Sequence, residues 1–359
     1  MKKFTRILVA VLAVAMLSMS FAGCGLVEDT EVVERVKILK ETVLTVADDI
    51  EVNGAYYGWF YSDEYNTAYA EAQQAAEAEA AADSAADSAA SSAATSDAAE
   101  ADSAAQAPVE VDVDIEAVKK STQDRIASTK MLRKKAEDAG IKLTSVDYAN
   151  ISDQVEQYRT QLTAGLSQQG MGISFNDYLS FMSTNADAVN EIFEDQYYGS
   201  LYLADLVKDD YVTAKHILVK YDDEVHTKEE AQTIINDIKK QLDEGADFDK
   251  LMKEKSEDTG ADGSVNSPEG YTFAQDGSMV PEFEAAAFAL AENAISDIVA
   301  VESAGYKGFH ILKKVPTSLS GIAPVLTSNE KIDAERDNAA KDVKVELKDK
   351  ISYFDSLYK

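Results

Sequence analysis

The spacing of hydrophobic residues changes along the chain at Tyr211. From 114 to 208, apolar residues recur every three or four positions, which predicts a series of helices. From Tyr211 to Pro316, short apolar runs that predict strands alternate with amphipathic helices. The resulting order, β-α-α-β-α-β-β over about a hundred residues, is typical of a small α+β domain.

Two elements are predicted near the N-terminal side of the helical region. Thr42 to Ala47 predicts a short strand that ends in a turn. From Ala55 to Tyr69 the chain is rich in aromatic residues, several of them four positions apart, such as Tyr57 and Tyr61. We interpret this spacing as the buried stripe of a helix rather than as a ligand site.

Residues 70–107 are a low-complexity segment of alanine, serine and acidic residues. The segment holds eight acidic residues, no basic residue and no large apolar side chain. Such a composition cannot bury a core, although alanine favours helix. The sequence therefore predicts a solvated, disordered insertion over 70–107.

The C-terminal residues 317–359 are predicted to be a linker followed by a charged helix that docks on the helical domain. The apolar residues expected to dock are Ile332, Val343, Val345, Leu347, Ile351, Phe354 and Leu357.

Charge and cysteine content exclude several functional classes. The 359 residues carry a formal net charge of −31, which repels phosphate backbones, so we expect no nucleic-acid partner. One cysteine, Cys24, excludes an intrachain disulfide and a zinc site built on cysteines. We expect no metal and no cofactor. Any imidazole chemistry must use His216, His226 or His310.

The N-terminus has the features of a secretory signal over residues 1–23. A basic start and an apolar run precede the small residues Ala22 and Gly23, and Cys24 follows at once. Phe21 to Cys24 resembles a bacterial lipobox, in which Cys24 becomes the first mature residue and carries lipid. A transmembrane anchor, or a plain signal beside a chance cysteine, is the alternative, but the apolar run is short for a span. We expect a lipid-anchored protein on the extracytoplasmic face of the cell membrane, with 24–41 as its tether.

Two histidines lie in the first and last strands of the α+β domain. His216 shares a strand face with Ala214 and Leu218, and His310 shares one with Leu312. Two histidines on one small sheet can meet as a hydrogen-bonded pair. The pattern alone favours the other reading, in which each is a separate histidine satisfied within the core. His226 lies in an acidic loop, and we assign it no role.

Four motifs in order make residues 211–316 resemble the parvulin-type peptidyl-prolyl cis-trans isomerases. They are Ala214-Lys215-His216-Ile217-Leu218, Ser256-Glu257-Asp258, Gly277-Ser278-Met279-Val280-Pro281-Glu282-Phe283-Glu284 and Gly308-Phe309-His310-Ile311-Leu312-Lys313.

The resemblance implies a role for each matching residue. His216, Asp258 and His310 would be the catalytic group. Met279 and Phe283 would form the proline pocket, with Tyr271 and Phe273 adding to its wall. Phosphate-directed relatives carry a basic loop after the first strand, where this chain has Asp222-Asp223-Glu224, so we expect no phosphoserine preference.

The lipobox and the preceding helices resemble the PrsA-type extracytoplasmic foldases. The implied fold class is α+β, with a parvulin-like four-stranded antiparallel sheet and surrounding helices at 211–316. A mostly helical domain similar to the chaperone domains of SurA and trigger factor would occupy 42–210.

The implied function is a prolyl isomerase and foldase for exported proteins. Its partners would be unfolded or partly folded polypeptides that contain X-Pro bonds, and the membrane through Cys24; a homodimer is left open. The alternative is a non-catalytic holdase chaperone that keeps the parvulin fold for binding or dimerisation.

Overall fold

The computed structural model describes residues 29–91, 111–221, 225–303 and 307–357. Within it the chain forms two compact units. The first, called here the helical unit, comprises residues up to Asp138, Lys142–Gln196 and Ala334–Lys359. The second, the sheet unit, comprises Ala139–Ile141 and Tyr197–Asp333. Cys24 and the signal segment lie outside the described residues.

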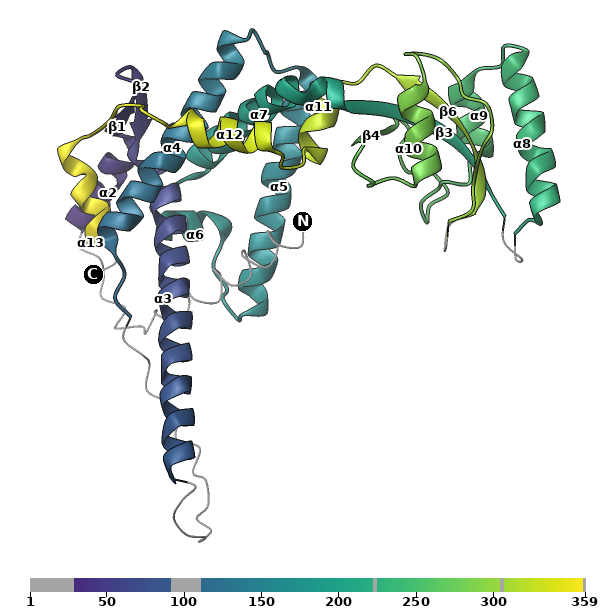
Figure 1. The fold of residues 1–359 in the computed structure, drawn as a ribbon. Helices are drawn as coiled ribbons and strands as arrows, with labels where there is room; N and C mark the ends of the chain where they lie inside the picture. Colours follow the sequence, from purple (N-terminus) through teal and green to yellow (C-terminus); the bar gives the residue numbers. More distant parts are fainter. Residues whose placement is uncertain (1–28, 92–110, 222–224, 304–306, 358–359) are drawn as a thin grey trace. The chain divides into compact units, whose positions relative to one another are not determined.

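The helical unit is mostly α-helical, as predicted, and also contains a three-stranded antiparallel sheet in the order β2-β1-β7 (Figure 1). Its elements are α2 (Asp29–Lys40), β1 (Thr42–Val46), β2 (Ile50–Asn53), α3 (Gly54–Ser91), α4 (Ile115–Asp138), α5 (Ser145–Gln168), α6 (Phe175–Phe181), the first half of α7 (Ala186–Val207), β7 (Val345–Leu347), η3 (Asp349–Ile351) and α13 (Ser352–Ser356). Helix α12 (Glu330–Ala339) runs from the sheet unit into it.

The aromatic residues at the start of α3 form the core of the helical unit, as their spacing predicted. Tyr56, Tyr57, Phe60 and Tyr61 are each at most 1% exposed. Phe354 of α13 packs on this group, with its ring centroid 4.9 Å from that of Tyr57. The stripe is therefore structural, and residues about 300 positions apart complete one core.

The prediction of disorder from residue 70 onward is wrong for the part that the structure describes. Helix α3 continues without interruption to Ser91, so residues 70–91 are helical. The reason is the high helix propensity of alanine, which favours helix in a segment that has no apolar face to dock. The rest of the predicted insertion, 92–107, lies outside the described residues.

The C-terminal segment differs from the single helix that was predicted. It contains α12, then strand β7, which pairs with β1, and then the short helix α13. Ile351 and Phe354 are buried in the core of the helical unit as expected, whereas buried Ile332 belongs to the sheet unit. Leu347 and Leu357 are more than a third exposed and do not dock. The strand forms because β1 offers an open edge that Val345 to Leu347 can pair with, which the local sequence cannot reveal.

The tether expected over 24–41 is also partly structured. Residues 29–40 form helix α2, and Ile38 of that helix is buried in the core of the helical unit. The apolar side chain of Ile38 gains more from burial in that core than from exposure in a free tether.

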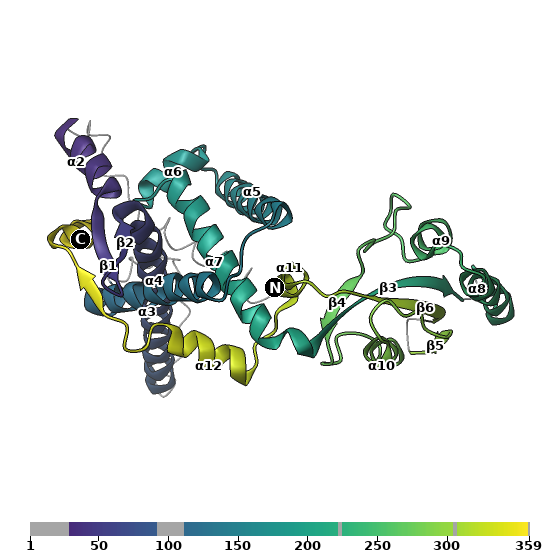
Figure 2. The ribbon, with the colours of Figure 1, turned by 90° about the horizontal axis from the view of Figure 1, so that it is seen from above.

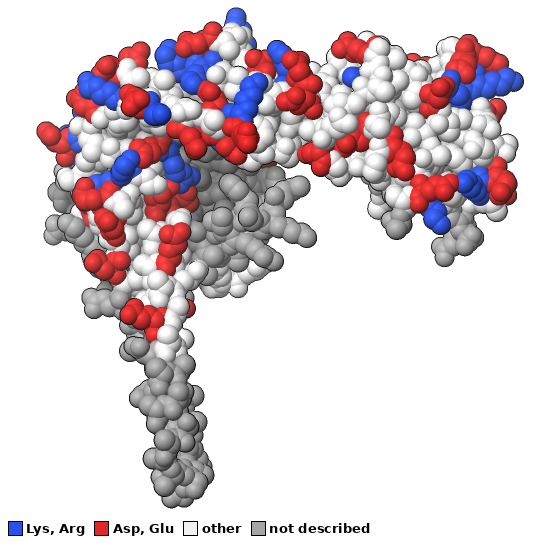
Figure 3. Space-filling view, in the orientation of Figure 1, with Lys and Arg blue, Asp and Glu red and all other residues white. Residues whose placement is uncertain are grey.

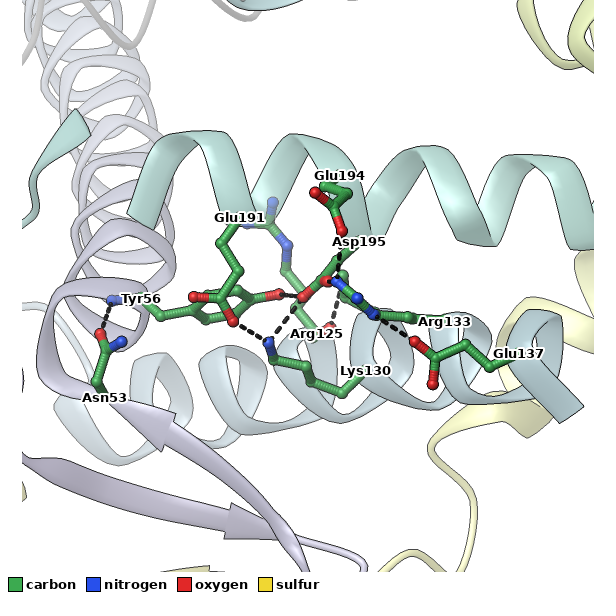
Figure 4. A network of polar contacts seen from close by, with 10 residues as sticks. Asn53, Tyr56, Arg125, Lys130, Arg133, Glu137, Glu191, Glu194 and Asp195 are labelled. Atoms are coloured by element: carbon green, nitrogen blue, oxygen red, sulfur yellow. Dashed lines mark hydrogen bonds and ion pairs between the residues drawn. The ribbon is translucent and has the colours of Figure 1, made fainter. Parts of the chain in front are cut away.

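A buried charge network joins three helices of the helical unit (Figure 4). Asp195 of α7 is fully buried and accepts a hydrogen bond of 2.9 Å from the Tyr56 hydroxyl of α3. Lys130 of α4 lies 2.7 Å from the same carboxylate, and Arg133 of α4 also pairs with it. No sequence motif marked this network, because its members come from distant parts of the chain.

The sheet unit contains the four-stranded antiparallel sheet that was predicted, in the order β4-β3-β6-β5 (Figure 2). Its elements are η1 (Lys208–Asp210), β3 (Tyr211–Lys220), α8 (Lys228–Asp243), α9 (Phe248–Lys255), β4 (Tyr271–Ala274), α10 (Pro281–Ala289), β5 (Val299–Val301), β6 (Gly308–Val315), α11 (Leu319–Ile322) and η2 (Ala323–Val325).

Helices cover both faces of this sheet. Helices α8 and α9 pack on the face that carries Ile217, Val219 and Ile311. Helix α10 lies on the opposite face, as Figure 2 shows. There it packs against Ala214 and Leu312. His216 and His310 have the strand parity of this second face. The sheet therefore places both histidines under α10.

Local signals fix the ends of the helices in this unit. Thr227 and Glu230 form a capping box at the start of α8, and Pro281 is the first residue of α10. Asn293 adopts a left-handed conformation with φ 65°, which asparagine tolerates better than most residues.

Candidate functional site

The pairing of β3 with β6 brings the two histidines together. Leu312 lies opposite His216, and Leu218 lies opposite His310, so the histidines are diagonal neighbours on one face. Their ring centroids are 5.2 Å apart with the planes at 63°. They meet edge to face and not through the hydrogen bond that was considered, since no described residue hydrogen-bonds to either ring nitrogen of His216.

Burial keeps both imidazoles uncharged near neutral pH. His216 is 7% exposed, and its burial lowers the pKa, against the opposing effect of Asp258. His310 is 2% exposed, and its burial together with the neighbouring His216 lowers the pKa to about 3. A charged ring in this apolar setting would lose its hydration without gaining a full counter-charge. The pair therefore presents neutral, polar edges to its surroundings.

The loop after α9 is held against β3 beside the histidines. The Ser256 hydroxyl accepts hydrogen bonds from the backbone amides of Leu218, at 3.2 Å, and Asp258, at 3.4 Å. The Glu257 amide donates to the Leu218 carbonyl at 2.8 Å. These bonds attach the segment to β3 at the residue that lies opposite His310, so Asp258 emerges next to the pair.

Two neutral donors fix the Asp258 carboxylate. The Tyr271 hydroxyl donates to Oδ2 and the Asn266 amide donates to Oδ1, both at 2.7 Å. Oδ2 also lies 3.4 Å from Nε2 of His216. Each carboxylate oxygen therefore has one good hydrogen bond, and one oxygen faces the histidine.

A pocket of about 260 Å³ lies over these groups, and its surface is mostly apolar. It is lined by His216, Asp258, Tyr271, Ser278, Met279, Val280, Phe283 and His310.

The Phe283 ring forms the floor of the pocket together with the histidines. Its centroid is 5.3 Å from that of His216 and 5.5 Å from that of His310. Tyr271 stacks on His216 at 5.6 Å, with the ring planes 15° apart. Such aromatic contacts favour one fixed arrangement of the rings.

Phe273 occupies a different place from the one the resemblance implies. It is 3% exposed and packs behind Phe283, at 5.8 Å between ring centroids, and is not among the residues that line the pocket. Along β4, Tyr271 and Phe273 share a face, but only Tyr271 lies opposite Ala214, close to His216. Phe273 therefore supports the pocket from behind.

The loop that carries Met279 is fixed by the helix that follows it. The Gly277 amide donates to a Glu284 carboxylate oxygen at 3.0 Å, and Gly277 has φ 78°, which favours glycine. Glu284 is 9% exposed and sits one turn into α10. This bond sets where the loop enters the helix, and hence where Met279 points.

Sequence reasoning missed several residues of the site. Asn266 carries no motif signal, and it became visible only because the loop folds back on Asp258. His226, to which no role was assigned, lies with Nε2 2.8 Å from Oε1 of Glu257. Val280 and Ser278 line the pocket and could have been found from their places beside Met279.

Among the described residues, no group of three or more histidine, cysteine or acidic side chains is arranged to hold a metal ion. Within those same ranges, none of the helices has the length and apolarity needed to cross a membrane.

Comparison with known proteins supports the resemblance for the sheet unit. Residues 202–316 match the family model described as PPIC-type PPIASE domain. These residues form a parvulin-type domain. The match includes all four strands of the sheet and every residue that lines the pocket.

Proteins that are similar to this chain include a parvulin-like PPIase, a chaperone SurA and a foldase protein PrsA. A parvulin-like PPIase of Rickettsia bellii is 35% identical over 129 residues, which cover 36% of this chain and 39% of that protein. A chaperone SurA of Methylobacillus flagellatus is 35% identical over 142 residues, 39% of this chain and 31% of that one. A foldase protein PrsA of Geobacillus kaustophilus is 34% identical over 151 residues, which cover 39% of this chain and 48% of that protein. The chain thus spans less than half the length of these relatives.

Among solved structures, PrsA from Bacillus subtilis covers 68% of this chain and 92% of its own, with 23% identity and a TM-score of 0.27. A score of this size does not by itself indicate a shared overall arrangement.

Proposed function

We propose that this protein is a peptidyl-prolyl cis-trans isomerase and foldase that acts on exported polypeptides at the outer face of the membrane. The observation that carries the proposal is an apolar pocket, walled by Met279 and Phe283, that opens directly over His216 and His310. A prolyl ring fits an apolar pocket of this kind, and the adjoining X-Pro bond would then lie against the polar wall.

The chemistry requires no nucleophile. Rotation about the X-Pro bond meets a barrier of about 18–20 kcal/mol, which amide resonance sets. A pocket that grips the ring and removes water from the carbonyl favours the twisted amide over the planar one, because resonance delocalises less charge in the twisted form. The neutral imidazole edges and the fixed Asp258 carboxylate provide the local field in which that twist occurs.

The proposed domain organisation follows the sequence prediction except at the tether, because α2 packs in the core of the helical unit. We assign the isomerase to 211–316, and a chaperone-like domain to 42–210 together with α2 and the docked C-terminal segment. Attachment through lipid on Cys24 is part of this proposal and rests on the lipobox resemblance. The names of the relatives, foldase PrsA and chaperone SurA, support the assignment.

The test is the rate of cis-trans exchange of a proline tetrapeptide, measured by NMR exchange spectroscopy without a coupling protease. We expect the full chain to accelerate exchange and Phe283→Leu to lower kcat/KM by about 10-fold or more, since the pocket floor loses its ring. His310→Ala is expected to lower the rate as well. Phe288→Leu is the matched control, because Phe288 is on the same helix but does not line the pocket. Exchange no faster than in buffer would refute the isomerase.

A holdase remains the second candidate because the helical unit exposes large apolar side chains. Val146, Tyr148, Ile173 and Phe181 on or beside α5 and α6 are 42–60% exposed. Such residues can hold unfolded chains without catalysis. Suppression of client aggregation by an intact protein that does not accelerate exchange would favour the holdase.

A further inference from the structure

The pocket wall carries one charged group. Of the described residues that line it, Asp258 alone has a carboxylate side chain, and none is a lysine or arginine. The side chain of Asp258 is 14% exposed, so it can be reached from the pocket. The remaining lining groups are apolar, aromatic, hydroxyl or neutral imidazole.

No cation in the described structure neutralises this carboxylate. Its two hydrogen-bond donors, Tyr271 and Asn266, are neutral. Its third neighbour, His216, is held uncharged because burial lowers its pKa. Lys215, which follows the opposite parity on β3, pairs instead with Asp249 at 3.1 Å. A negative charge thus stands in a small, mostly apolar pocket without a cationic partner, where its field is screened less than in water.

The surrounding unit reinforces this field. Residues 211–316 hold 21 acidic residues and 11 lysines, a net charge of −10. Acidic side chains are spread over the face of the protein shown in Figure 3, with basic ones among them. A cationic segment would therefore be attracted to the unit before it reaches the pocket.

We propose that the site selects X-Pro bonds in which X is lysine or arginine, and this rests on the proposed function. With the prolyl ring against Met279 and Phe283, the bond to be rotated must lie along the wall of His216 and Asp258. The residue before proline is then the nearest to Asp258, and its side chain can place a cation beside the carboxylate. A glutamate or phosphoserine in the same place meets an uncompensated negative charge.

The experiment compares tetrapeptides that differ only in X, with lysine, leucine or glutamate before proline, and uses the full chain. We expect kcat/KM to be about 10-fold higher for lysine than for glutamate at low ionic strength, with leucine between them. That ratio corresponds to about 1.4 kcal/mol. Raising the ionic strength from about 0.02 M to about 0.5 M is expected to shrink the ratio, since salt screens the attraction.

Two variants separate the local charge from the general acidity of the protein. Asp258→Asn is expected to bring the lysine-to-glutamate ratio below about 3-fold, whatever it does to the absolute rate. Asp237→Asn makes the same change of net charge on the exposed surface of α8, across the sheet from the pocket, and is expected to preserve the ratio. Equal loss in both variants would attribute the preference to overall charge and overturn the assignment to Asp258.

Binding is measured in parallel, by NMR titration of each peptide, so that the result does not depend on catalysis. Equal affinities and equal rates for lysine and glutamate peptides would overturn this inference and leave the isomerase intact. Failure to accelerate any peptide would refute the isomerase, while a binding preference for lysine in that same protein would still support the charge selection.

Discussion

At the scale of single residues, the site depends on histidines that are buried without charge. His310 is among the most deeply buried polar residues of the sheet unit, and its folded-state pKa of about 3 lies far below the value near 6.5 expected in an unfolded chain. Above pH 6.5 the His310 ring is neutral in both the folded and the unfolded protein, so it does not lower the free energy of unfolding. As pH falls from 6.5 toward 3, the unfolded chain binds a proton that the folded chain refuses, and stability is lost.

We therefore expect the sheet unit to lose stability on mild acidification, by roughly 2 to 3 kcal/mol from His310 between pH 6.5 and pH 4.5. The measurement is the rate of hydrogen exchange at the β3 amides as a function of pH, because these amides report on the stability of the sheet unit alone. The control is His310→Leu, which removes the titrating group and should show a shallower dependence on pH. Identical slopes in the two proteins would contradict the burial of a neutral His310.

The residues of the site were predictable where a motif carried them. His216, Asp258, Met279, Phe283 and His310 line one pocket, and the roles that the resemblance implies for them stay predictions. The roles of Asn266 and of the Tyr271 hydroxyl were not predictable, because they depend on how one loop folds back on Asp258. Phe273 was misplaced for a similar reason, since strand parity gave its face but not which of two aromatics reaches the pocket.

At the scale of elements, local signals were accurate where they act within a few residues. The amphipathic helices predicted between the strands form, and two of them begin at local signals, a capping box at Thr227 for α8 and Pro281 for α10. The length of α3 and the existence of β7 were not predicted. Helix α3 is longer than expected because the helix propensity of alanine extends it into the low-complexity segment. Strand β7 forms because it pairs with β1, which is distant in the sequence.

The charge network between α3, α4 and α7 gives a test at this scale. Asp195→Ala removes the carboxylate that faces Lys130 and Arg133, and leaves buried Lys130 with only the half-exposed Glu191. We expect the helical unit to lose about 3 to 5 kcal/mol, as is usual when one partner of a buried pair is removed. Chemical unfolding followed by fluorescence of Trp59, the single tryptophan, reports on this unit.

The matched comparison for that variant is Asp124→Ala, which removes an exposed i,i+4 partner of Lys120 on the same helix α4. Its effect should stay below about 0.5 kcal/mol. If both variants destabilise equally, the network of Asp195 is not what joins the three helices.

At the scale of the whole molecule, the helical unit is discontinuous in sequence. Its central strand β1 pairs with β7, and its aromatic core is completed by Phe354, both from the last fifteen residues. The sheet unit is almost continuous, from Tyr197 to Asp333. The helical unit therefore cannot finish folding until the end of the chain is available.

Phe354→Ala tests this dependence. The side chain is fully buried against Tyr57 and Tyr61, so we expect a loss of about 3 to 5 kcal/mol in the helical unit. Hydrogen exchange of β3 in the sheet unit should be unchanged, since the two units have separate cores. Leu357→Ala, at a residue 37% exposed, is the control and should cost less than about 1 kcal/mol. Equal loss of protection in both units would show that they unfold as one.

The sequence by itself determined the sheet unit and the places of its pocket residues, because strand parity, helix caps and four spaced motifs all act locally. It also determined the net charge of −31, from which we expect no nucleic-acid partner. Only the tertiary structure decided the edge-to-face geometry of the histidines, the neutral donors on Asp258 and the joining of α2 and the C-terminal segment in one core. These arise from contacts between residues far apart in sequence, and burial there sets charge states that no local pattern encodes.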